Sequence, residues 1–249
     1  MTKYAALSDT GRKRSSNQDA WFADVERGLF LLADGMGGHA AGEVAAELTV
    51  RTFKEFASLV MEDREVTWPF GYDAQAGFEG NLLRTAARLA NLKVCSAAEE
   101  RSQHAGMGST LVCLWLHQQE AFYCHVGDSR LYLYRKGELR QLTEDHSLVQ
   151  EQMRAGLISA STARRHALRH VVTRAIGSQE SFQPDVDRRP LQTDDVFLLC
   201  SDGLNDRLED PEIASLLDED DLEASCRRLV HAANKAGGED NVTVVLVRV

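Results

Sequence analysis

The sequence lacks three features: paired cysteines, a long apolar run and an excess of positive charge. Its five cysteines are scattered without a Cys-x-x-Cys motif, so neither a disulfide framework nor a zinc site is indicated, and a reducing cytoplasm is expected. No apolar run approaches the length of a bilayer span, and no signal-peptide core begins the chain, so we expect no membrane contact. A net charge of -10 argues against nucleic-acid partners, which require a basic surface.

The most informative feature that is present is a set of aspartates at the borders of apolar runs. These runs are short and consist of bulky or β-branched residues, which predicts buried strands. The acids are Asp34, Asp128, Asp202 and Asp240, and glycine follows Asp34 and Asp202 directly. One Asp-Gly is an ordinary turn signal, but the repetition favours convergence of the acids in space. Converging carboxylates repel one another unless cations neutralise them, and carboxylates beside the Gly35 carbonyl suit Mg²⁺ or Mn²⁺.

Together with Asp9-Thr10-Gly11 and the segment from Arg14 to Asp19, these motifs resemble the PP2C-like (PPM) metal-dependent serine/threonine phosphatases in their compact bacterial form. The resemblance extends from Ser8 to the C-terminal apolar run. It implies an α+β fold, a four-layer αββα sandwich of two largely antiparallel sheets flanked by helices. It also implies hydrolysis of phosphoserine and phosphothreonine on proteins, opposing a bacterial Ser/Thr kinase.

The resemblance also implies two Mn²⁺ or Mg²⁺ ions, with a bridging water as the attacking nucleophile. Asp34 would bridge the ions, the Gly35 carbonyl would complete one site, and Asp202 and Asp240 would hold the other. Asp19 would orient metal-bound water.

Three further roles follow from the same resemblance. Arg14 would grip the phosphoryl oxygens with its guanidinium fork, and Asp128 and Asp206 would bind a weaker third metal. The general acid stays open between His39 and metal-bound water, since Met36 stands where several eukaryotic relatives have a histidine. Gln18 stands where many relatives carry an acid that contacts metal through water.

We expect one phosphatase domain over residues 1–249, with a flap at about 147–180 beside the active site. The flap is locally basic, so we hypothesise that it receives phosphorylated protein substrates. His166 and His170 are four residues apart, which can indicate a metal pair, but with no third ligand type nearby in the sequence a solvated basic segment is favoured. The expected partners are phosphoproteins and a cognate kinase, and we expect a monomer.

Periodicity and turn signals predict the secondary structure around these motifs. Strands are expected at Tyr4–Ser8 and Ala20–Ala23, and a hairpin is expected to turn at Lys136-Gly137. Thr143 is a candidate cap for a short helix through Gln152 and Met153. The remaining expectations are helices beginning near Glu43, Leu82, Pro211 and Leu222, and a loop over about 62–80.

Three other functions stay open on the sequence alone. Cys124 and Arg130 have the Cys-x5-Arg spacing of cysteine phosphatases, whose thiolate attacks phosphorus, although that loop should lead into a helix. A noncatalytic relative could bind metal or phosphoprotein as a regulator. A two-metal phosphodiesterase would use the same kind of acidic cluster.

Overall fold

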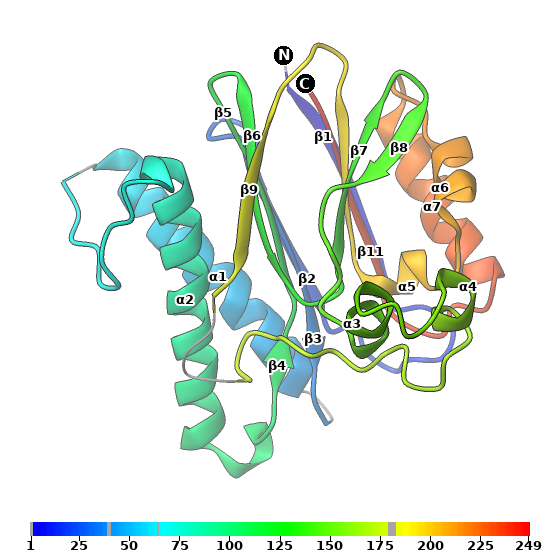
Figure 1. The fold of residues 1–249 in the computed structure, drawn as a ribbon, viewed down its shortest axis with the longest axis horizontal. Helices are drawn as coiled ribbons and strands as arrows, with labels where there is room; N and C mark the ends of the chain where they lie inside the picture. The colour runs from blue at the N-terminus through cyan, green and yellow to red at the C-terminus, as the bar shows by residue number, and fades with distance from the viewer. Residues whose placement is uncertain (1, 39–40, 64, 179–182) are drawn as a thin grey trace. The chain divides into compact units, whose positions relative to one another are not determined.

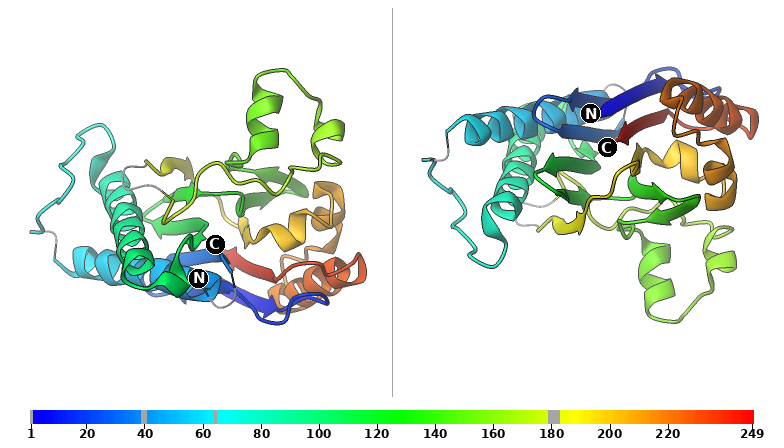
Figure 2. Two further views of the ribbon diagram at one scale, coloured as in Figure 1. Left: turned by 90° about the horizontal axis from the view of Figure 1, so that it is seen from below. Right: turned by 90° about the horizontal axis from the view of Figure 1, so that it is seen from above.

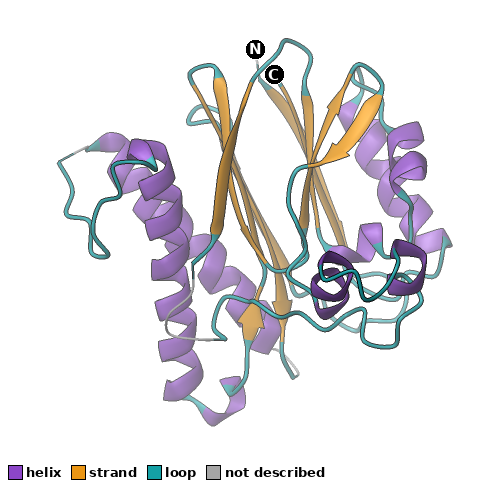
Figure 3. Ribbon diagram, in the orientation of Figure 1, coloured by secondary structure: helices purple, strands orange, loops and turns teal. Residues whose placement is uncertain are grey.

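The computed structural model describes residues 2–38, 41–63, 65–178 and 183–249, so the candidate acid His39 lies outside the described residues. The chain divides into two compact units, each built on its own antiparallel sheet. Unit 1 comprises Met1–Asn17, Val126–Ala175 and Asp194–Val249, and unit 2 comprises Gln18–His125 and Ile176–Thr193. Within each unit, the long helices lie along one face of the sheet (Figures 1 and 3).

The sheet of unit 1 has five strands in the order β1-β11-β10-β7-β8, and its neighbouring strands are antiparallel. The strands are β1 (Lys3–Asp9), β7 (Arg130–Arg135), β8 (Glu138–Gln141), β10 (Val196–Cys200) and β11 (Val242–Arg248). The two central strands, β10 and β11, are almost fully buried, as expected for apolar runs without a polar face. Both candidate acids that border these runs, Asp202 and Asp240, therefore stand at the ends of central strands.

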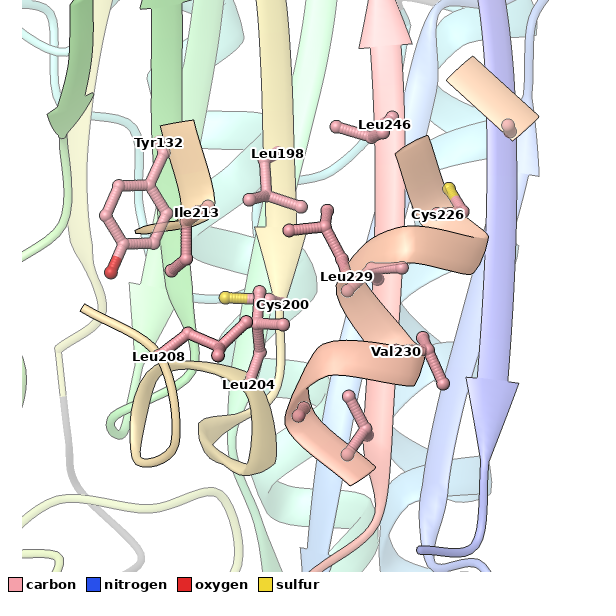
Figure 4. Close-up of a cluster of buried hydrophobic side chains, with 14 of the residues drawn as sticks. Tyr132, Leu198, Cys200, Leu204, Leu208, Ile213, Cys226, Leu229, Val230 and Leu246 are labelled. Atoms are coloured by element: carbon pink, nitrogen blue, oxygen red, sulfur yellow. The ribbon is translucent and has the colours of Figure 1, made fainter. Parts of the chain in front are cut away.

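Helices α5 (Asp202–Asn205), α6 (Asp210–Leu216) and α7 (Leu222–Lys235) contact this sheet or one another. The helix α7 places Leu222, Cys226, Leu229, Val230 and Ala233 on its buried face, at the spacing of an amphipathic helix. These side chains pack against alternate residues of β10 and β11 in one apolar cluster (Figure 4). Complete burial of a leucine such as Leu229 contributes about 2 kcal/mol, so this cluster anchors the strand ends that carry the acids.

The segment expected to form the flap contains α3 (Leu148–Arg154) and α4 (Ala160–Ala163). Both views of Figure 2 show these two short helices standing away from the strands of unit 1. The cap of α3 is Ser147, whose hydroxyl accepts from the Gln150 amide. The prediction of Thr143 as that cap is wrong, because the Thr143 hydroxyl accepts from the amide of Leu131 instead.

Unit 2 contains a six-stranded sheet in the order β2-β3-β5-β6-β9, with β4 paired to β3. The strands are β2 (Asp19–Asp24), β3 (Leu29–Met36), β4 (Gly108–Ser109), β5 (Leu111–His117), β6 (Glu120–Val126) and β9 (Asp185–Pro190). The strand β3 does not stop at the Asp-Gly pair as the sequence suggests, because Gly35 and Met36 go on to pair with Ser109 and Gly108 of β4. Asp34 is therefore held inside a strand rather than at its end.

Helices α1 (Ala41–Glu62) and α2 (Gly77–Glu100) pack against each other, and α1 also contacts β2, β3 and β4. A 3-10 turn, η1 (Ser102–His104), follows α2. Small residues such as Ala45, Ala46, Ala86 and Ala90 are fully buried, which allows these long helices a close approach. Among the described residues, no helix combines the length and the apolar character needed to cross a bilayer.

The other expected elements agree with the structure, except that α2 begins at Gly77, inside the expected loop of about 62–80 and before the expected start near Leu82. The hairpin of β7 and β8 turns at Lys136 and Gly137, which both have positive φ, as the tight two-residue turn requires. A proline stands in the first turn of α6, as the sequence predicts, and Asp221 caps α7 by accepting from the Ala224 amide. The expected loop before α2 runs to Ala76 in the described residues.

Candidate active site

Asp19 and Asp34 form a directly opposed pair on neighbouring strands of unit 2. The register of β2 and β3 places Asp19 against Asp34, and directly opposed residues share one face with Cβ atoms roughly 5 Å apart. The backbone of Asp34 is fixed on its other side, where its amide donates to the Thr110 hydroxyl (2.9 Å) and its carbonyl accepts from the Thr110 amide (2.8 Å). Like charges at opposed positions repel, so this arrangement favours a cation beside the pair.

Gly35 is held where no side chain fits. A Cβ at this position would lie 2.0 Å from the carbonyl oxygen of Gly42 and 2.7 Å from that of Gln18. The amide of Gly35 donates to the Gln18 carbonyl at 3.1 Å. The glycine after Asp34 thus allows the start of α1 and the residue before β2 to close against β3, which orients the Asp34 backbone. Gln18 itself is buried and lies against Gly42.

In unit 1, Gly203 and Asn241, the residues that follow Asp202 and Asp240, are in direct contact. A Cβ on Gly203 would lie 2.0 Å from the carbonyl oxygen of Asn241, so only glycine allows the start of α5 to meet the start of β11. Ser201, which lies between β10 and α5, adds two hydrogen bonds to β11, since its amide donates to the Thr243 carbonyl and its hydroxyl accepts from the Thr243 amide. Asp202 and Asp240 are therefore carried by backbone segments that touch.

Asp206 and Asp128 lie beside Asp202 in the same unit. Asp206 caps α5 one turn after Asp202, with its amide donating to the Asp202 carbonyl at 2.8 Å. All three acids line a cavity of about 290 Å³ that also includes Asp145 and Arg169. Burial, followed by the charges of Asp145 and Asp206, raises the pKa of Asp128 to about 7. A carboxyl group in this position is crowded by negative charge that a bound cation would offset.

Arg14 pairs with one of the candidate metal ligands. Its Nη2 donates to Oδ2 of Asp240 at 2.7 Å, and half of the arginine side chain is exposed. The other carboxylate oxygen of Asp240 accepts from the amide of Asn241 at 2.8 Å. The predicted phosphate-binding residue and the predicted metal ligand are therefore neighbours within unit 1.

His170 is a member of the acidic group that the sequence did not identify. Its Nδ1 lies 3.0 Å from Oδ2 of Asp206, and ligand atoms of His170, Asp202 and Asp206 lie within 4.8 Å of one another. The sequence argument against a histidine ligand was that no third ligand type lies near His166 and His170, and that argument fails for His170. Its neighbours are more than 30 residues away in the chain, so no local spacing could have revealed them.

These donor sets fit hard divalent cations. Their aspartates offer carboxylate oxygens, with backbone carbonyls nearby, which are the donors that Mg²⁺ and Mn²⁺ prefer, and the His170 imidazole lies beside Asp206. The crowding at Asp128 and the opposition of Asp19 and Asp34 are both costly without a cation. In unit 1 the set is Asp128, Asp202, Asp206 and Asp240, and in unit 2 it is Asp19 and Asp34.

The family model described as protein phosphatase 2C matches residues 10–246. The chain belongs to the protein phosphatase 2C family. The serine/threonine phosphatase stp of Listeria monocytogenes serovar 1/2a is 37% identical over 248 residues, which cover 96% of this chain and 93% of that protein. A crystal structure of the Mycobacterium tuberculosis serine/threonine phosphatase PstP/Ppp matches 100% of this chain and 98% of that chain, with a TM-score of 0.87 and 36% identity.

A second solved structure holds metal. It is the catalytic domain of PstP in complex with two manganese ions, with a TM-score of 0.82 and 35% identity over 99% of this chain and 97% of that chain. The predictions of a PP2C-like α+β fold with two largely antiparallel sheets, and of a metal-dependent protein serine/threonine phosphatase, are confirmed. As a protein phosphatase, this member of the family acts on phosphorylated proteins.

The cysteine-phosphatase alternative does not fit the structure. Cys124 lies fully buried within β6, where a thiolate nucleophile would have no access to substrate. The guanidinium of Arg130 is held by the Asp145 carboxylate through contacts of 2.7–3.1 Å, and Arg130 begins a strand rather than a helix. The individual roles predicted for the candidate site residues stay predictions.

Proposed function

We propose that Asp34, Asp202 and Asp240 hold the two divalent cations, Mn²⁺ or Mg²⁺, with which this phosphatase hydrolyses phosphoserine and phosphothreonine. When bound, such cations supply charge neutralisation and a water of lowered pKa as the nucleophile. The observation that carries the proposal is the opposition of Asp19 and Asp34 in β2 and β3. A sheet that keeps two carboxylates opposite each other is best explained by a cation that binds beside them.

The residues of each unit have distinct tasks in this proposal. Asp34 would contribute carboxylate oxygens to both cations, and Gly35 would add its backbone carbonyl oxygen. Asp202 and Asp240 would contribute carboxylate oxygens from unit 1, supported by the contact between Gly203 and Asn241. Asp19 would offer a hydrogen-bond acceptor that orients water next to Asp34.

Arg14 binds the phosphoryl group. A guanidinium offers two parallel N–H donors and stays charged at every working pH, which suits two phosphoryl oxygens. Its pairing with Asp240 at 2.7 Å supports this role, because the arginine lies next to a residue that would hold the cation. Asp128 and Asp206, which line one cavity, would bind a weaker third cation.

The cellular setting is part of the proposal. The substrates would be targets of a cognate bacterial Ser/Thr kinase, and the enzyme would work in the cytoplasm as a monomer. The five free cysteines are consistent with a reducing compartment. Residues 1–249 would act as a single phosphatase domain, with the flap of about 147–180 beside the substrate.

The direct test compares three phosphate esters at equal manganese concentration. A phosphothreonine peptide and p-nitrophenyl phosphate should both be hydrolysed with Mn²⁺ and not with EDTA. Bis-p-nitrophenyl phosphate should be a poor substrate, since a diester lacks the second free oxyanion that Arg14 and the cations would bind. Preference for the diester would instead support a phosphodiesterase, and no turnover of any ester would support a noncatalytic regulator.

A further inference from the structure

Asn241 holds both ends of the segment that carries Arg14. Its Nδ2 donates to the carbonyl oxygens of Thr10 and Ser16, each at 2.9 Å. The side chain of Asn241 is buried, with 4% of the residue exposed. A primary amide has two N–H donors on one nitrogen, so a single side chain can bind two carbonyls that flank the arginine on either side in the sequence.

The backbone of the same residue orients a candidate metal ligand. The amide of Asn241 donates to Oδ1 of Asp240 at 2.8 Å, while Arg14 binds Oδ2 of that carboxylate. Replacement of the side chain removes the first set of contacts and leaves this backbone contact in place. The two tasks of Asn241 are thus separable by mutation.

The middle of the segment is fixed by other groups. The amides of Arg12 and Lys13 donate to the carbonyl of Gly238 at 2.7 and 3.2 Å, and Asn17 donates to the Ser8 hydroxyl at 2.7 Å. Loss of the Asn241 amide would therefore release the two ends of the segment without removing all of its anchors. The expected consequence is a shift in the backbone from which Arg14 extends, rather than loss of the fold.

We propose that Asn241 is a positioning residue for phosphate binding: its side-chain amide fixes the 10–16 segment so that the Arg14 guanidinium meets the phosphoryl oxygens. This inference rests on the proposed role of Arg14. A flexible side chain that is half exposed is placed chiefly by its backbone. A displacement of about 1 Å at a binding group can cost large factors in rate or affinity.

Loss of the Asn241 amide should weaken binding of the phosphoryl group and leave metal binding nearly unchanged. Without the amide, the KM for p-nitrophenyl phosphate and the inhibition constant of inorganic phosphate should both rise, by roughly tenfold. The manganese concentration for half-maximal activity should stay within about twofold, because the backbone contact to Asp240 remains. A purely structural role would instead lower the active fraction, which reduces kcat and leaves KM unchanged.

The experiment measures KM and the phosphate inhibition constant at saturating manganese, and the half-maximal manganese concentration in a separate titration, for wild type, Asn241→Ala, Asn241→Ser and Arg14→Ala. The serine variant keeps one donor at the buried position and should give an intermediate KM, and it carries the test if the alanine variant does not fold. The control is Asn81→Ala in α2, since the Asn81 amide is buried and also donates to two carbonyls, those of Asp73 and Gly77. Its KM should match that of wild type.

The outcomes separate the two claims. A raised KM and phosphate inhibition constant in Arg14→Ala and in the folded Asn241 variants, but not in Asn81→Ala, would support the inference. A raised KM in Arg14→Ala alone would overturn the role of Asn241 and leave the proposed function intact. An unchanged KM in Arg14→Ala would overturn the proposed role of Arg14 and, with it, this inference.

Discussion

Asp19 of β2 and Asp34 of β3 face each other across one antiparallel register. Apolar or oppositely charged pairs stabilise such positions, whereas like charges destabilise them. Without bound metal, the protein should therefore be less stable with this pair of aspartates than with an uncharged pair at the same two positions. Two residues that the proposed chemistry needs thus stand at positions where like charges repel.

The first prediction concerns this pair. In the presence of a chelator, Asp34→Asn should unfold at a temperature about 1–4 °C above wild type, because one charge of the opposed pair is removed. With manganese, wild type should gain stability and Asp34→Asn should gain much less. Differential scanning calorimetry with and without manganese measures both effects.

A matched control lies in β2, the strand that also carries Asp19. Asp24 stands opposite Leu29 and binds Arg27 at 2.9 Å, so Asp24→Asn removes an attraction rather than a repulsion. It should lower or leave unchanged the unfolding temperature in chelator and keep the manganese response. If Asp34→Asn behaved as this control does, the repulsion and the cation beside Asp34 would both be refuted.

The second prediction concerns the contact between α5 and β11. Gly203→Ala should lower the free energy of unfolding by about 3 kcal/mol, since its methyl group would meet the Asn241 carbonyl oxygen. The displacement should also separate Asp202 from Asp240 and raise the manganese concentration needed for activity. Urea unfolding and a manganese titration of activity test the two parts, and a variant with unchanged metal requirement would contradict the second.

The third prediction uses the raised pKa of Asp128, caused by burial and by Asp145 and Asp206. A carboxyl group with a higher pKa in the folded state binds more protons there than in the unfolded chain. Its contribution to stability is therefore lost as the pH rises from about 4 to about 7. In chelator, Asp128→Asn should lose less stability over this range than wild type, as measured by urea unfolding at several pH values. Parallel pH profiles for the two proteins would show that the Asp128 pKa is not raised.

The fourth prediction concerns the basic side chains of the flap. Arg169 lines the same cavity as Asp202 and Asp206, and Arg164 binds Glu209 at 2.8 Å. Arg169→Ala should reduce kcat/KM for an acidic phosphopeptide several-fold more than for p-nitrophenyl phosphate, because only the peptide reaches beyond the phosphoryl group. Arg164→Ala should have a smaller effect, since its charge is already paired.

Arg227→Ala in α7 is the control for this comparison. Arg227 is exposed and forms an ion pair with Glu223 on its own helix. Its replacement should therefore cause a small and equal change in kcat/KM for the two substrates. Equal losses on both substrates in Arg169→Ala would show that the flap does not select phosphoproteins.

The sequence predicted the parts of the fold that local patterns determine. Apolar runs such as those of β10 and β11 are too short for helices and are bordered by aspartates, so both the strands and the candidate acids could be found. The turn at Lys136-Gly137 was predicted because a glycine there separates two short runs of strand-like sequence. Thr143 was wrongly assigned as a helix cap, since its hydroxyl accepts a hydrogen bond from the Leu131 amide of β7. Local spacing in the sequence does not reveal this partner.

The same distinction applies to the site. Asp34 and Asp202 carry a local signal, the Asp-Gly after an apolar run, although the reason for each glycine was only partly foreseen. Gly35 and Gly203 are needed because Gly42 and Asn241 approach them. The contacts of His170 with Asp206 and of Asn241 with the Arg14 segment join residues far apart in the chain. Such contacts could be found only in the folded structure.

The central claim is that Asp34, Asp202 and Asp240 hold a pair of divalent cations on which phosphate hydrolysis depends. The most direct measurement is manganese stoichiometry by titration calorimetry, with turnover of a phosphothreonine peptide followed on the same metal-stripped samples. The account predicts two tightly bound manganese ions in wild type, fewer in the alanine variant of each aspartate, and turnover that returns only in metal-loaded wild type. Full turnover by the metal-stripped protein, or unchanged stoichiometry in the three variants, would contradict it.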